Sequence, residues 1–164
     1  MLKRLSCLLW LGLSLPTFAV DLPVIEVFMP KVCLACIDWA DHLRQNGFTV
    51  RVTQTDEMEA VKRRLKVPRA LEAIPSAQVA GYFIEGHVHA DQIKELLTEK
   101  PKALGLAVPG LPLGAPGREY SNPTCETACT VLEKESGAQR TRREFYETLL
   151  VLDRQGRTKT YARH

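Results

Sequence analysis

The sequence predicts an α/β protein, and two observations carry this prediction. Short apolar strands alternate with amphipathic helical patterns over the first two thirds of the chain. Two cysteines separated by two residues, Cys33 and Cys36, stand between the first strand and the first helix. The 164 residues suffice for one domain with a proper core. We expect a single domain over residues 20–164, with its core in residues 24–100.

The first elements follow from the spacing of apolar residues. Residues 24–28 are strongly apolar and predict a short strand. Apolar positions spaced by three predict a helix over 34–45, which Gly47 ends. Alternating apolar and polar residues predict a second strand over 48–52. The other elements expected in the core are a helix over 56–65, a short helix or turn over 71–75, paired strands at 78–80 and 82–84, and a helix over 91–99.

The C-terminal part is an extension of this core. The proline-rich stretch 105–117 predicts a rigid loop, because its prolines and glycines suit neither a helix nor a central strand. Residues 118–140 are polar and carry Cys125 and Cys129. Residues 149–162 predict a terminal β-hairpin. A strand, a cysteine pair, a helix, a strand, a helix, a proline, a hairpin and a helix form the thioredoxin-like order, which we therefore expect.

The first nineteen residues differ from the rest. Lys3 and Arg4 precede an apolar run from Leu5 to Leu15, and Ala19 ends a small-residue cleavage pattern. This combination predicts a secretory signal peptide over residues 1–19. The alternative is a membrane anchor, but a spanning helix needs roughly 20 apolar residues. We expect an exported, periplasmic protein with no membrane attachment after cleavage.

The charge balance gives no support for two classes of partner. The chain carries 22 basic and 19 acidic residues, a net charge of +3. Loss of Lys3 and Arg4 with the leader leaves 20 basic against 19 acidic residues, or +1. A nearly neutral chain gives no reason to expect binding to nucleic acid or to an anionic membrane.

The Cys33–Cys36 pair is the candidate catalytic site. At the start of a helix, unpaired N–H groups and the helix dipole would lower the pKa of Cys33 below the usual value of about 8.5. Cys33 would then be the exposed, attacking thiol, and Cys36 would resolve the mixed disulfide. Pro75 stands where a thioredoxin-like fold places a cis-proline beside this pair, and would shape the substrate groove. The alternative is an ordinary trans proline in a loop.

Four cysteines remain after the leader is removed, and an even number in an exported protein suggests disulfides. The spacing favours the pairs Cys33–Cys36 and Cys125–Cys129. Each pair could be an inert structural disulfide, and the first could instead bind a soft metal such as copper(I). The second pair could exchange electrons with the first, complete a four-sulfur metal site, or staple a separate loop.

The histidines offer a further candidate ligand. His87 and His89 flank Val88 near the start of the last core helix. A His-x-His pair can bind a metal, but on an extended segment the two side chains point to opposite faces. His87 is therefore a candidate metal ligand, with a capping or surface role as the alternative.

Several motifs resemble one known family. Trp39–Leu43, Asn46–Phe48, Glu85–Val88 and Ala107–Gly110 are similar to the CopG-like proteins of bacterial copper-resistance systems. The resemblance covers most of residues 24–164, and it implies a thioredoxin-like fold with copper bound at cysteine sulfur. Residues differ at positions where the family carries soft or nitrogen ligands, namely Ala35, Ile74, Pro75, Leu111 and Arg118.

Three functions therefore compete. The first is a periplasmic thiol–disulfide oxidoreductase, which acts on protein thiols and needs no cofactor. The second is a copper(I)-binding protein that uses Cys33 and Cys36, with Cys125, Cys129 or His87 as further ligands, and exchanges metal with copper-handling proteins. The third is a disulfide-stabilised scaffold without catalysis. The lost ligand positions favour the first.

Overall fold

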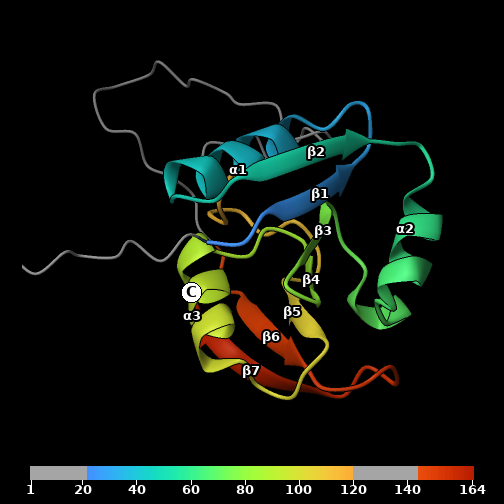
Figure 1. Ribbon diagram of the computed structural model, residues 1–164, viewed down its shortest axis with the longest axis vertical. Coiled ribbons are helices and arrows are strands. Elements are labelled where there is room, and N and C mark those ends of the chain that lie inside the picture. Colours follow the sequence, from blue (N-terminus) through green and yellow to red (C-terminus); the bar gives the residue numbers. More distant parts are fainter. Residues whose placement is uncertain (1–21, 120–143) are drawn as a thin grey trace, which may run out of the picture.

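The computed structural model describes residues 22–119 and 144–164 (Figure 1). The α/β class and the predicted order of elements are confirmed. The elements are β1 (Ile25–Met29), α1 (Leu34–Gln45), β2 (Val50–Gln54), α2 (Met58–Leu65), a 3-10 helix (Arg69–Leu71), β3 (Ser76–Val79), β4 (Tyr82–Glu85), α3 (Ala90–Glu99), β5 (Gly105–Ala107), β6 (Glu147–Val151) and β7 (Thr158–Arg163).

All these strands belong to one sheet with the order β2-β1-β3-β4-β5-β6-β7. β1 pairs with β2 and β4 pairs with β5 in parallel, whereas the other neighbours are antiparallel. In the β1–β3 pair, Phe28 lies opposite Ser76. The first four strands and the three helices match the thioredoxin-like plan, and β5 to β7 extend the sheet on one side.

The helices cover the two faces of the sheet. Trp39 of α1 and Ile93 of α3 pack in one core with strand residues such as Ile84. Phe83, the neighbour of Ile84, points to the other face, where it packs with Val67 just after α2. Figure 1 shows α3 and α2 on opposite sides of the sheet. The alternation of side chains along β4 thus separates the two layers.

β5 corrects one sequence-based expectation. The predicted loop over 105–117 begins with a strand, Gly105–Ala107, which lies between β4 and β6. Three residues are too few to show an alternating pattern. Gly105 fits there because a Cβ atom would lie 2.0 Å from the carbonyl oxygen of Phe83. The irregular chain starts only after this strand.

The terminal hairpin is present as β6 and β7, and it continues the main sheet. The chain just before β6 is tied to the proline-rich loop. The Glu144 N–H donates to the Leu113 carbonyl over 2.9 Å, and the Leu113 N–H donates to the Glu144 carboxylate over 3.0 Å. Residues 113 and 144 are therefore held side by side.

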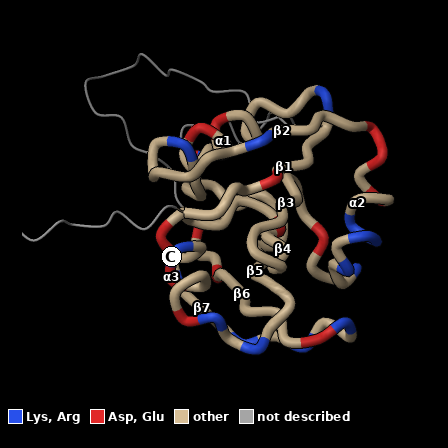
Figure 2. The backbone as a smooth tube through the Cα atoms, in the orientation of Figure 1, with Lys and Arg blue, Asp and Glu red and all other residues tan. Residues whose placement is uncertain are grey.

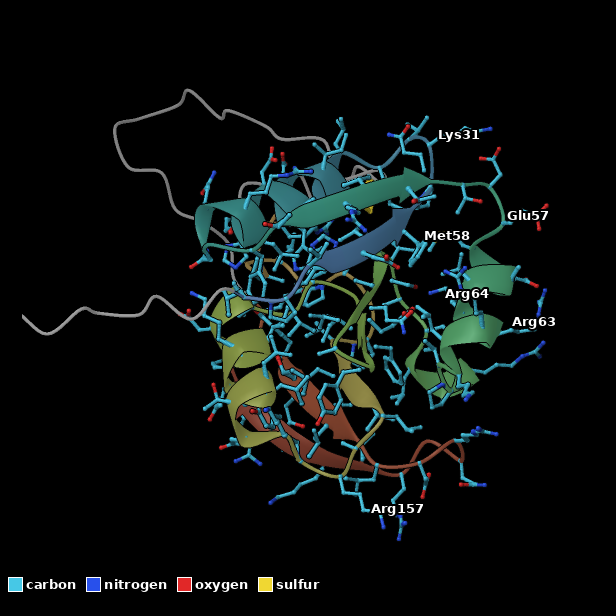
Figure 3. All side chains as sticks on the ribbon, in the orientation of Figure 1. Lys31, Glu57, Met58, Arg63, Arg64 and Arg157 are labelled. Atoms are coloured by element: carbon cyan, nitrogen blue, oxygen red, sulfur yellow. A yellow bond between two sulfur atoms is a disulfide. The ribbon has the colours of Figure 1, made fainter. Side chains whose placement is uncertain are left out.

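Charged residues lie mostly at the periphery of the fold, where the backbone tube of Figure 2 is coloured blue or red. Arg63 and Arg64 project from α2, as Figure 3 shows, and the Arg64 guanidinium lies 4.7 Å from the centre of the Phe28 ring. Among the ion pairs of the described residues, only Lys62–Glu85 has both side chains less than one-tenth exposed. That pair lies on the α2 face, close to the candidate site.

Two predictions lie outside the described residues: the signal peptide over 1–19, and Cys125 and Cys129 in the segment 118–140. In residues 22–119 and 144–164, no helix has the length and hydropathy that crossing a membrane requires.

Candidate dithiol site

Cys33 and Cys36 form a disulfide at the start of α1, as their spacing predicts. Cys33 is the N-cap residue of the helix, with an extended backbone. The Cys36 N–H donates to the Cys33 sulfur over 3.3 Å. The sulfur of Cys33 thus occupies the place where a side chain satisfies an otherwise unpaired amide of the first helical turn. A thiolate formed there on reduction would meet the same amide and the positive end of the helix dipole.

The disulfide is more deeply buried than expected. Cys36 is fully buried and Cys33 is only 7% exposed, so the expectation of an openly exposed Cys33 is wrong. Its neighbours are accessible instead: Val32 is 76%, Leu34 50% and Ile37 40% exposed. We call these three side chains the apolar rim. The chain therefore presents apolar side chains to solvent around a nearly covered sulfur pair.

Pro75 lies beside this pair in the fold. The Ile74–Pro75 peptide bond is cis, as predicted. Because Ser76 lies opposite Phe28, Pro75 is placed next to the C-terminal end of β1. The loop that carries Cys33 leaves β1 at that end. The sheet register thus brings the predicted cis-proline and the disulfide to the same edge.

A buried ion pair, Lys62–Glu85, binds the backbone just before Pro75. Lys62 donates both to the Glu85 carboxylate and to the carbonyl oxygen of Ala73. The Ala73 N–H donates to the same carboxylate over 2.7 Å. Both peptide groups of Ala73 are thereby held, two residues before the cis bond. Burial raises the pKa of Glu85, and the charge of Lys62 opposes this shift.

His87 is buried, so a surface role is wrong. Its side chain has no exposed area, and its Nδ1 lies 2.7 Å from the carbonyl oxygen of Pro116. A carbonyl only accepts, so Nδ1 carries the proton and Nε2 has the lone pair. Burial lowers the pKa of His87 to about 4; the nearby charge of Arg118 contributes to this shift, and the hydrogen bond to Pro116 opposes it.

The surroundings of His87 do not suit a metal ion. Nε2 has no hydrogen-bond partner among the described residues. The described residues also contain no group of three histidine, cysteine or acidic side chains that could hold a metal. The positive charge of Arg118 would repel a cation at this place. The structure therefore gives His87 a structural contact with the proline-rich loop.

This buried histidine predicts a dependence of stability on pH. His87 titrates near pH 6.5 when unfolded and at about 4 when folded. Its neutral form contributes fully above pH 6.5, and this contribution is lost as the pH falls towards 4. A shift of this size corresponds to about 3 kcal/mol. Urea denaturation between pH 7 and pH 4 should show a shallower pH dependence for His87→Asn than for the wild type, and equal slopes would contradict this assignment.

The other histidines form a separate cluster. His89 is the N-cap residue of α3, and its ring stacks on that of His164 with centroids 4.4 Å apart. Its Nε2 lies 2.8 Å from the hydroxyl of Tyr146. His42 accepts a hydrogen bond from the Ala90 N–H over 3.2 Å, and burial lowers the pKa of His42. His87 and His89 thus have different partners and do not converge on one ligand position.

A pocket of about 470 Å³ lies beside this cluster. Its walls combine stacked rings, two carboxylates and an exposed phenylalanine: His89, Gly114, Glu119, Glu144, Phe145, Tyr146 and His164. Neither Cys33 nor Cys36 lines it. Among the described residues, the pocket and the cysteine pair are therefore two separate sites.

The fold and the site together define an α/β protein with a disulfide at a helix start and a cis-proline at the same sheet edge. Residues 72–118 match a family described as a protein of unknown function, DUF411. No curated protein sequence matches the chain significantly.

Two solved structures are similar to it. Form 1 of the copper resistance protein CopG is 33% identical, covers 87% of this chain and 98% of its own, and has a TM-score of 0.69. Form 2 of the same protein is 31% identical, covers 88% and 99%, and has a TM-score of 0.70. The chain belongs to the CopG family.

Sequence reasoning missed three features of the site. It identified Glu85 only as part of a motif and His87 only as a candidate metal ligand, because a contact with Ala73 or Pro116 depends on loops distant in sequence. It placed Lys62 on a helix without recognising its burial. It did not recognise the apolar rim, for which the apolar residue Val32 between Lys31 and Cys33 was the signal in the sequence.

Proposed function

We propose that the chain is an exported, periplasmic thiol–disulfide oxidoreductase that serves copper resistance. One observation carries the proposal: the Cys33–Cys36 disulfide caps α1 at the sheet edge where the cis-peptide of Pro75 lies. A sulfur atom at a helix N-terminus is a good leaving group, because the helix end stabilises the thiolate that results. The similarity to copper resistance protein CopG supports the setting in copper resistance.

The reaction is a two-electron exchange. A thiolate of a partner protein attacks the Cys33 sulfur and forms a mixed disulfide, and Cys36 leaves as a thiolate and takes up a proton. A second partner thiolate then attacks the partner's own sulfur, and Cys33 is released as a thiolate. The partner gains a disulfide and the protein gains two thiols. The same steps run backwards when the reduced protein meets a partner disulfide.

The apolar rim supports a protein partner. Val32, Leu34 and Ile37 are exposed next to Cys33, where they can pack against apolar residues that flank a partner cysteine. Small charged thiols would gain nothing from such contacts. The proposed partners are therefore periplasmic proteins with cysteine thiols, including copper-handling proteins whose sulfur ligands must stay reduced.

The test is the reduction potential, measured by equilibration with glutathione in the purified protein and read by mass spectrometry. We expect a value in the range of exchange catalysts, between about −270 and −120 mV. The variants Cys33→Ser and Cys36→Ser separate the roles: Cys36→Ser should accumulate a mixed disulfide at Cys33, whereas Cys33→Ser should not react. A potential below about −300 mV would instead indicate a permanent disulfide and a scaffold role.

Copper(I) binding is a second candidate, and the similarity to CopG favours it. Once reduced, Cys33 and Cys36 would supply two soft thiolates, a donor set that suits copper(I). His87 would add no ligand, because Arg118 places a positive charge beside it. Copper would here be the cargo that the protein binds and passes on, with Cys125 and Cys129 as proposed further donors.

Copper(I) titration of the reduced protein against a chromogenic chelator distinguishes this candidate. We expect the Cys33→Ser, Cys36→Ser double variant to lose the tightest site, while Cys125→Ser, Cys129→Ser reports on the second pair. His87→Asn serves as the control and should bind as the wild type does. Unchanged copper stoichiometry in the first double variant would rule out this site.

A further inference from the structure

The proline-rich loop lies directly on the first turn of α1. Gly117 has a φ of +79°, and a Cβ atom added to it would lie 2.6 Å from the Ala35 carbonyl oxygen and 2.8 Å from the Trp39 nitrogen. Ala115, two residues earlier, has no exposed area. The loop backbone thus touches the helix with no room for a side chain. In Figure 1 this segment, coloured gold to orange, runs close to α1.

The same turn of α1 holds the second cysteine. Cys36 lies between Ala35 and Trp39 in the sequence, and it is fully buried. Ala35, in the first turn of the same helix, is only 2% exposed. The side chains that remain accessible, Val32 and Leu34, flank Cys33. The contact with the loop thus coincides with a difference in exposure between the two cysteines, 7% for Cys33 and none for Cys36.

His87 fastens the loop in this position. Its Nδ1–H donates to the Pro116 carbonyl, one residue before Gly117. The next residue, Val88, accepts a hydrogen bond over 2.8 Å from the indole N–H of Trp39 on α1. Two successive residues therefore hold the loop and the helix against each other. Within the loop, the Arg118 N–H donates to Ala115 over 2.7 Å and keeps the turn closed.

We infer that His87 is a positioning residue for the dithiol: through Pro116 it keeps the proline-rich loop on α1, shields Cys36 and so confines attack to Cys33. The inference rests on the proposed function in taking sulfur exchange as the relevant chemistry. The shielding itself is a property of the folded chain. It can therefore be measured without a partner protein.

The experiment is alkylation of the reduced protein with iodoacetamide, followed by peptide mass spectrometry. In this reaction a thiolate forms a bond to carbon and iodide leaves. We expect the wild type to be labelled at Cys33 and to leave Cys36 unmodified. His87→Leu removes the bond to Pro116, and Gly117→Ala pushes the loop from the helix while His87 stays intact. His87→Leu should raise the labelling rate of Cys36 about tenfold, the factor that one buried hydrogen bond represents in an opening equilibrium, and Gly117→Ala should also raise it.

Two controls separate positioning from general destabilisation. His87→Asn keeps an N–H that can reach the Pro116 carbonyl and should restore protection of Cys36. Ile93→Val removes a methylene from the core at α3 and leaves the hydrogen bonds of the loop intact, so it should lower stability without changing the labelling. Labelling of Cys36 at the wild-type rate in folded His87→Leu or Gly117→Ala would overturn the inference.

The wild-type protein supplies a check that needs no variant. The amides of Gly114 and Arg118, both bonded within the loop, should exchange hydrogen as slowly as the amides of α1. Exchange at the rate of an unstructured peptide would show that the loop does not stay on the helix. If the reduction potential indicates a permanent disulfide while Cys36 stays shielded, the proposed function fails and the role of the loop stands.

Discussion

Replacing Glu85 with alanine should lower the free energy of unfolding by about 3–5 kcal/mol, the range observed when one partner of a buried ion pair is removed. The change leaves the ammonium group of Lys62, 8% exposed, without its counter-charge. It also leaves the Ala73 N–H without its acceptor. Urea denaturation followed by far-UV circular dichroism measures the loss.

An exposed ion pair provides the control. Asp91→Ala breaks the Lys94–Asp91 pair, in which the Asp91 side chain is 86% exposed, and should cost less than about 1 kcal/mol. The double variant Lys62→Met, Glu85→Leu removes both charges and should recover part of the stability, since apolar residues of similar size often replace a buried pair well. Recovery should be incomplete because Ala73 keeps two unpaired peptide groups. A loss for Glu85→Ala no larger than for Asp91→Ala would contradict the role assigned to this pair.

Replacing Gly86 with alanine should destabilise the fold to a similar extent, because the position has no room for a side chain. A Cβ atom would lie 2.2 Å from the carbonyl oxygen of Val108, a backbone atom that cannot move without disturbing β5. The φ of Gly86 is +74°, which adds strain for any residue with a side chain. We expect a loss of at least about 3 kcal/mol, near the upper end of single substitutions.

The variant Gly110→Ala distinguishes the steric clash from the backbone strain. The φ of Gly110, +77°, is nearly the same, but nothing lies within 4 Å of its Cβ position. Gly110→Ala should therefore cost only the backbone strain, about 1–2 kcal/mol. Thermal denaturation of both variants under one set of conditions gives the difference, which reports the clash alone. Equal losses would mean that the contact with Val108 relaxes freely.

The core elements could be predicted because their signals are local. The helix over 34–45 was predicted with its observed bounds, since apolar spacing and Gly47 define both ends within one short stretch. The cis bond at Pro75 was predicted from its place in the order of elements. β5 escaped prediction because its three residues derive their conformation from β4 and β6 on either side.

The site was predictable only in part, for the same reason. The Cys33–Cys36 disulfide follows from a spacing that the sequence displays directly. The burial of Cys33 does not, because it depends on how distant segments fold over α1. His87 illustrates this dependence on distant segments most clearly. Its partner Pro116 is 29 residues away, and no local sequence pattern predicts a hydrogen bond between them.

The paired hydrogen bonds between Leu113 and Glu144 have an evolutionary consequence. They hold residues 113 and 144 side by side, and Glu119 and Glu144 line the same pocket, so the sequence between residues 119 and 144 can change in length or composition at a small entropic penalty for closing the loop. Cys125 and Cys129 fall within this stretch. Thiols can therefore be gained or lost there during evolution without a change in the seven-stranded sheet. Exchanging this stretch between relatives is a practical way to transfer its thiols from one protein to another.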